Sequence, residues 1–171
     1  MPEIVIVAGP NGAGKTSFAS QYLDTDDARS YINADEIART LVLTELPNDK
    51  ADLLAARSML TRIGELVEAG TSFTFETTLA SLTYARKIPE WQQRGYVVAL
   101  LYLRLPTVQD SIDRVRRRVL AGGHDIPEHI IRRRFERSLN YLSSVYRPLV
   151  DECYIFQSLE GRFELEDTWP A

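Results

Sequence analysis

A glycine-rich loop near the N-terminus constrains this chain more than any other feature of its sequence. Residues 9–16 read GPNGAGKT and match the pattern G-x-x-x-x-G-K-[ST] at every fixed position. The apolar, β-branched run Glu3–Ala8 precedes the loop and predicts a buried strand, and residues 16–23 predict a helix after it. In this setting backbone N–H groups converge on one concavity at a helix N-terminus, which favours an anion. The pattern therefore predicts a nucleoside triphosphate site; the alternative is a glycine-rich turn that binds nothing.

The expected nucleotide contacts lie in this loop and at the start of the helix after it. Lys15 is expected to reach the outer phosphates, and the Thr16 hydroxyl is expected to coordinate Mg²⁺. The residues expected to bind the nucleotide are Gly9, Pro10, Asn11, Gly12, Ala13, Gly14, Lys15, Thr16 and Ser17.

Predicted strands alternate with predicted helices along the rest of the chain. Two arginine-rich helices are separated by Gly122 and Gly123, and Pro127 suits the first turn of the second. In the helix expected at 81–94, Pro89 should introduce a kink or a break. The alternation favours an α/β fold, with a mainly parallel sheet covered by helices on both faces. Further strands are predicted at 31–33, 72–76, 97–103, 153–157 and 162–165, and further helices at 35–44 and from about 53 to a stop at Gly70.

Length and composition narrow the class of protein. The 171 residues suit one domain, residues 1–171, and the 44% apolar and 26% charged residues are a globular balance. Cys153 is the single cysteine, and no apolar run reaches the roughly 20 residues of a membrane span. The net charge of −4 argues against a whole-surface nucleic-acid binder. We therefore expect a cytoplasmic protein with neither a nucleic acid nor a membrane as partner.

The loop alone does not distinguish kinases from motors, GTPases or switches. No apolar strand ends in an aspartate that would hold magnesium, because residues 97–103 run into Arg104. A guanine-reading N-K-x-D sequence is absent, and the chain is too short for the machinery of most mechanical ATPases. Small-molecule kinases remain, since they need only a phosphate loop, a substrate base and a basic lid.

Four segments in order resemble the zeta-toxin family: residues 8–16 (AGPNGAGKT), 33–38 (NADEIA), 75–78 (FETT) and 122–127 (GGHDIP). The resemblance spans most of the chain, from about Ile4 to Leu142. It implies a P-loop NTPase or kinase fold and an ATP-dependent kinase that phosphorylates a sugar hydroxyl of a UDP-N-acetylglucosamine-type acceptor. It also implies a protein antitoxin as a candidate partner.

Two carboxylates are expected beside the loop, because ligands bind at the carboxyl ends of parallel strands. Asp35 is the candidate that orients and deprotonates the attacking hydroxyl; the alternative is an N-cap for the following helix. Glu76 is a candidate for binding a substrate hydroxyl, or magnesium through water, and a plain strand-end carboxylate is the alternative. Asn33 and Thr78 are further substrate-contact candidates.

Helical geometry and the family resemblance together single out two arginines. Arg118 and Arg134 flank the apolar stripes of their helices and match the lid pattern that the resemblance implies, where they would stabilise the transferring phosphoryl group. The alternative for each is a surface salt bridge. His124 lacks the partners of a zinc site and is kept as a loop-ordering or substrate contact. Where the family tends to have an aspartate-asparagine-serine element, this chain has YIFQSLEG at 154–161, so no residue is assigned to the nucleotide base.

Two other functions remain compatible with the sequence. One is an ATP-binding module that orders its lid to engage a protein partner. The other is a nucleoside or nucleotide kinase of related fold.

Overall fold

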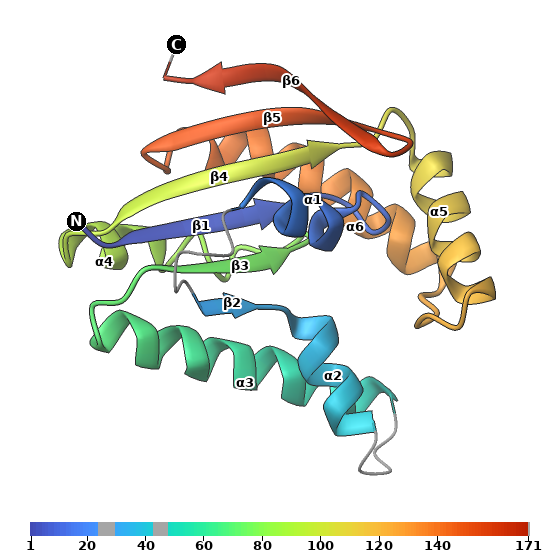
Figure 1. The fold of residues 1–171 in the computed structure, drawn as a ribbon, viewed down its shortest axis with the longest axis horizontal. Coiled ribbons are helices and arrows are strands. Elements are labelled where there is room, and N and C mark those ends of the chain that lie inside the picture. The colour runs from blue at the N-terminus through green and yellow to red at the C-terminus, as the bar shows by residue number, and fades with distance from the viewer. Residues whose placement is uncertain (24–29, 43–47, 171) are drawn as a thin grey trace.

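The computed structural model describes residues 1–23, 30–42 and 48–170, which form a six-stranded sheet with helices around it (Figure 1). The strand order is β2-β3-β1-β4-β5-β6, and all neighbours are parallel except the antiparallel pair β5 and β6. The strands are β1 (Glu3–Ala8), β2 (Ser30–Ile32), β3 (Phe73–Thr77), β4 (Val97–Arg104), β5 (Glu152–Leu159) and β6 (Arg162–Trp169). The helices are α1 (Lys15–Tyr22), α2 (Ala34–Val42), α3 (Asn48–Glu68), α4 (Ile88–Gln93), α5 (Val108–Leu120) and α6 (Glu128–Tyr141), followed by a π-helical turn, η1 (Leu142–Tyr146).

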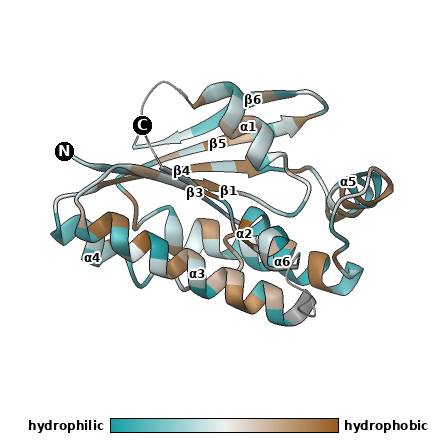
Figure 2. Cartoon of the chain, turned by 60° about the horizontal axis from the view of Figure 1, so that its bottom comes forward, coloured by the Kyte–Doolittle hydropathy of each residue, from teal (hydrophilic) through white to brown (hydrophobic). Residues whose placement is uncertain are grey.

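Strand β1 shows how the sequence produces the two layers of helices. Alternate side chains of a strand point to opposite faces of a sheet. Ile4 and Ile6 pack into the core formed with α3, α4 and η1, whereas Val5 and Val7 pack on the side of α1. Figure 2 shows α3 and α4 on one side of the sheet and α1 on the other. The predicted α/β fold with a mostly parallel sheet and helices on both faces is confirmed.

Strand register brings the predicted site to one edge of the sheet. Ala8, the last residue of β1, lies opposite both Thr77 at the end of β3 and Tyr102 near the end of β4. The glycine-rich loop, the end of β3 and the end of β4 therefore open onto the same edge. The arginine-rich helices α5 and α6 pass beside this edge (Figure 1).

The helix predicted at 81–94 is wrong over its first half. Residues 81–87 form turns, and only Ile88–Gln93 is α-helical, with Pro89 in the first turn, where its missing N–H has no helical partner to lose. The hydroxyl of Tyr146 donates to the Ser81 carbonyl (2.6 Å) and accepts from the Ala85 N–H (3.3 Å). This tertiary contact satisfies backbone groups that a helix would otherwise have paired.

Two further observations complete the fold. Burial raises the pKa of the Cys153 thiol to about 11, so this cysteine is a packing residue of β5.

Within residues 1–23, 30–42 and 48–170, no helix combines the length and the apolar character needed to cross a membrane.

Gly64→Ala is expected to stabilise the protein by about 1 kcal/mol, because Gly64 lies inside α3 and a Cβ there would meet no atom within 4 Å. The midpoint of thermal unfolding should rise by about 2–4 °C. Gly70→Ala is the matched control: its Cβ also has open space, but its φ of 66° disfavours any side chain, so its midpoint should fall. A fall for Gly64→Ala would contradict this account of α3.

Candidate functional site

The glycine-rich loop joins β1 directly to α1. Gly9 approaches β4 so closely that a Cβ would lie 2.4 Å from the Leu103 carbonyl oxygen, so only glycine fits. Gly14 has a φ of 83° and precedes α1 without any side-chain cap on the helix N-terminus. The N–H groups of the first turn of α1 therefore face the concavity of the loop, an arrangement suited to an anion.

Lys15 lies at the centre of a cluster of charged side chains. Its Nζ donates to the carbonyls of Gly9 (3.0 Å) and Pro10 (3.2 Å). Burial lowers the pKa of Lys15, and the charges of Glu76 and Asp35 act in the opposite direction. Arg118 and Arg134 also act on this pKa, as weaker lowering influences. The five charged residues that the sequence singled out as site candidates are thus gathered around one amino group: Lys15, Asp35, Glu76, Arg118 and Arg134.

Glu76 is a buried carboxylate beside the phosphate loop. Burial raises its pKa, while Lys15 and the Thr16 hydroxyl lower it. The Tyr31 hydroxyl of β2 also donates to Glu76 Oε1. Carboxylate and hydroxyl oxygens side by side are a suitable donor pair for Mg²⁺, which usually takes its other ligands from phosphate and water. Phosphate and water would have to complete the coordination, because the described residues contain no cluster of three or more acidic, histidine or cysteine side chains able to hold a metal by themselves.

Asn33, rather than Asp35, caps α2. Its Oδ1 accepts from the Asp35 N–H (2.8 Å), and its Nδ2 donates to Thr16 Oγ1 (3.3 Å). The alternative of Asp35 as N-cap is therefore wrong. Asp35 lies in the first turn of α2 with 65% of its side chain exposed, and its Oδ2 is 4.0 Å from Arg118 Nη1.

Asn33→Ala is expected to lower the free energy of unfolding by about 1 kcal/mol, because the cap of α2 is lost. Asn33→Ser should retain most of that stability, since serine caps helices through its own hydroxyl. Urea unfolding of the two variants checks the difference. Equal losses in both would show that the bond to Thr16, and not the cap, carries the contribution of Asn33.

The arginines divide into those that face the site and those that pair on the surface. Arg118 donates to the His124 carbonyl (3.1 Å), and its Nε is buried without a hydrogen-bond partner in the described part of the chain. Burial lowers the pKa of Arg134, and Asp52 and Asp35 oppose this effect. By contrast, Arg116 pairs with Glu128 at 3.0 Å, and Arg117, Arg133 and Arg137 are exposed.

Two remaining candidates adjoin residues of this site: His124 contacts Arg118, and Thr78 follows Thr77, whose carbonyl accepts from the Gly9 N–H. His124 orders its loop through its backbone carbonyl, and its side chain is exposed. Thr78 follows the end of β3 and is half-buried next to Leu79, a buried residue with a φ of 60°. A positive φ at a leucine is a costly conformation that must be imposed by its surroundings, and here the Leu79 N–H donates to Thr77 Oγ1 (3.1 Å).

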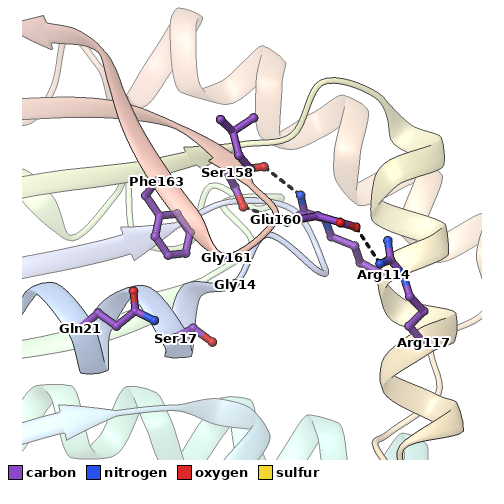
Figure 3. Close-up of a pocket in the computed structure, with 10 residues that line it drawn as sticks. Gly14, Ser17, Gln21, Arg114, Arg117, Ser158, Glu160, Gly161 and Phe163 are labelled. Carbon is purple, nitrogen blue, oxygen red and sulfur yellow. Dashed lines mark hydrogen bonds and ion pairs between the residues drawn. The ribbon is translucent and has the colours of Figure 1, made fainter.

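A cavity of about 420 Å³ adjoins the phosphate loop, and sequence reasoning missed it. Figure 3 shows Ser17 and Gln21 of α1 on one side, Arg114 and Arg117 of α5 on another, and the β5–β6 hairpin with Phe163 between them. Its volume lies within the usual range of small-molecule sites. One signal was available: Ser17 and Gln21 are four residues apart, Arg114 and Arg117 are three apart, and each pair shares a helix face. The complete lining is Gly14, Ser17, Gln21, Arg114, Arg117, Ser158, Leu159, Glu160, Gly161 and Phe163.

Comparison with known sequences gives two matches. The family model described as zeta toxin matches residues 1–158. An uncharacterised protein of Haemophilus influenzae is 26% identical over 131 residues, which are 77% of this chain and 91% of that protein.

Comparison with solved structures identifies the same fold. A chain in the crystal structure of AvrRxo1-ORF1 and ORF2 with ATP has a TM-score of 0.73 at 16% identity; the match covers 98% of this chain but only 58% of that one. A structure of the PezAT toxin–antitoxin system of Streptococcus pneumoniae has a TM-score of 0.70 at 17% identity, covering 98% and 72%. A gluconokinase from Sinorhizobium meliloti has a TM-score of 0.56 at 16% identity, covering 92% and 83%. The fold is therefore that of the P-loop kinases.

Proposed function

The chain belongs to the zeta-toxin family, and from that premise we propose that it is an ATP-dependent kinase that transfers the γ-phosphate of ATP to a hydroxyl group of a small-molecule acceptor. The observation that carries the proposal is the convergence of Asp35, Glu76, Arg118 and Arg134 on Lys15 of the phosphate loop. Phosphoryl transfer requires positioning and electrostatic stabilisation more than covalent chemistry. This arrangement can supply both.

The nucleotide would be held by two adjoining parts of the site. The N–H groups of the loop and of the first turn of α1 would bind the phosphates, with Lys15 on the outer ones. The cavity beside Ser17, Gln21 and Arg114 would receive the base. Thr16 and Glu76 would hold Mg²⁺, which when bound neutralises charge that develops on the phosphates.

Asp35 would orient the acceptor hydroxyl and take its proton. The carboxylate is exposed, so an acceptor can reach it from solvent, and it lies in the first turn of α2, which follows the carboxyl end of β2 just as the loop follows that of the parallel strand β1. Arg118 and Arg134 would bind the equatorial oxygens of the transferring phosphoryl group, and the Arg118 Nε–H, which has no hydrogen-bond partner among the described residues, is a donor that suits this role.

For the acceptor, we propose a sugar nucleotide of the UDP-N-acetylglucosamine type, as the family resemblance implies. Asn33, Glu76, Thr78 and His124 border the region where it would bind, but both ends of the Asn33 amide already have partners within the chain. A nucleoside or a sugar acid is the second candidate, because the gluconokinase shares the fold.

The test is an acceptor screen with purified protein, ATP and Mg²⁺. UDP-N-acetylglucosamine should gain one phosphate by mass, with stoichiometric ADP formation. Phosphorylation of gluconate or a nucleoside instead would support the proposed kinase activity but change the proposed acceptor. If no sugar, nucleoside or antibiotic hydroxyl raises ATP turnover above background, the kinase proposal fails.

We also propose a protein antitoxin as partner, because PezAT is a toxin–antitoxin system and AvrRxo1-ORF1 is solved with ORF2. Co-purification with the product of a neighbouring gene is the expected result. Such a complex without any acceptor-dependent turnover would favour an ATP-binding module over an enzyme.

A further inference from the structure

Three consecutive carbonyls of the phosphate loop accept hydrogen bonds from side chains outside the loop. Ser111 Oγ of α5 donates to the Asn11 carbonyl. Arg114 Nη1, one turn further along α5, lies 3.5 Å from the Gly12 carbonyl oxygen. Ser158 Oγ of β5 donates to the Ala13 carbonyl at 2.7 Å. We call Ser111, Arg114 and Ser158 the carbonyl clamp.

The two serines of the clamp are buried, and Arg114 donates hydrogen bonds to one of them, Ser158. Ser111 is 0% exposed and Ser158 is 1% exposed, although serine is usually a surface residue. Arg114 donates to Ser158 Oγ through Nη1 and to the Ser158 carbonyl through Nη2, both at 2.9 Å (Figure 3). The guanidinium, the Ser158 hydroxyl and the Ala13 carbonyl therefore form a chain in which each hydrogen bond polarises the next.

Holding a carbonyl on the outside of the loop determines where the next N–H points. The peptide group is planar and trans, so its C=O and N–H point in opposite directions. Fixing the Asn11 and Ala13 carbonyls outward thus turns the N–H groups of Gly12 and Gly14 toward the concavity. Both glycines have positive φ angles, 80° and 83°, and glycine restricts its own backbone least of all residues. The loop therefore gains from outside the rigidity that its own sequence lacks.

We propose that Ser111, Arg114 and Ser158 are positioning residues for triphosphate binding. They preorganise the N–H groups of the loop, and the two serines do not contact the phosphates themselves. This inference rests on the proposed function to the extent that the loop binds phosphate. It also couples the position of Arg118 to the phosphate loop, because Arg118 lies one turn beyond Arg114 on the same face of α5. The helix that brings an arginine to the phosphoryl group is thus anchored on the loop that holds it.

The test compares serine variants by calorimetry with two probes, Mg²⁺–ATP and Mg²⁺–tripolyphosphate. Ser158→Ala and Ser111→Ala should each weaken both probes by about tenfold, the equivalent of one hydrogen bond. Tripolyphosphate has no base, so its weaker binding cannot arise from the cavity. Arg114→Lys keeps the charge but not the planar fork that reaches two atoms of Ser158, and it should weaken tripolyphosphate similarly.

Ser138→Ala is the matched control. Ser138 is also 0% exposed, and its hydroxyl bonds to the Tyr102 hydroxyl at 2.8 Å. It should lower the ligand-free unfolding midpoint about as much as the clamp variants while leaving tripolyphosphate affinity unchanged. Clamp variants that bind tripolyphosphate as tightly as the unmodified protein would overturn the inference, and so would an equal loss in Ser138→Ala. An unmodified protein that binds neither probe would overturn the proposed function as well.

Discussion

Asp35→Asn is expected to reduce phosphoryl transfer by about 10²–10⁴-fold while ATP binding stays intact, because the amide cannot accept the proton of the attacking hydroxyl. The carboxylate is largely exposed, and its one ion pair within the described part of the chain is the 4.0 Å approach of Arg118, so the fold does not depend on it. Acceptor-dependent turnover and calorimetric titration with ATP measure the two effects separately.

Glu36→Gln is the matched control for this variant. Glu36 lies beside Asp35 in the first turn of α2, where either acid stabilises the helix N-terminus by a similar amount. Both variants should therefore unfold at similar temperatures, whereas only Asp35→Asn should lose transfer. Equal activity of the two variants would remove Asp35 from the proposed role of base.

Lys15→Ala is expected to reduce transfer by at least 10²–10³-fold and also to weaken ATP binding, because the ammonium group stabilises charge in the bound nucleotide and in the transition state. This pattern differs from that of Asp35→Asn, in which affinity is retained. Titration with ATP followed by turnover at saturating ATP separates the two effects.

The sequence offers a control for this variant too, since Lys15, Lys50 and Lys87 are its three lysines. Lys87 is half-buried just before α4, away from the phosphate loop. Lys87→Ala should therefore bind ATP and transfer phosphate normally. A Lys15→Ala variant as active as Lys87→Ala would contradict the phosphate-loop assignment.

Local sequence was sufficient wherever one short segment determines its own conformation. The apolar run of β1, the glycines after it and the start of α1 predicted the strand, the loop and the helix N-terminus. Parallel strands end at one edge, so the convergence of Asp35 and Glu76 near Lys15 followed from the predicted topology, and the structure brings these residues together. Their catalytic roles stay predictions.

The features that were missed depend on contacts between distant segments. The turns at 81–87 are held by Tyr146, 61 residues beyond Ala85. Asp35 and Asn33 are both good helix caps, and the structure shows that the Asn33 side chain caps α2 and also reaches Thr16, 17 residues away. The cavity needs α1, α5 and the β5–β6 hairpin together, so no single segment carries its signature. Nothing in the local sequence distinguishes Arg114 from the neighbouring arginines, and its role depends on the hydrogen bond to Ser158, 44 residues away.

The inert thiol of Cys153 has a practical consequence for labelling α5. A buried sulfhydryl with a pKa of about 11 reacts poorly with maleimides at neutral pH, so the unmodified chain should give almost no labelling background. Leu120, at the end of α5, is 88% exposed. A Leu120→Cys variant would therefore accept a single fluorophore on the arginine-bearing helix, whose emission can be followed as nucleotide and acceptor are added.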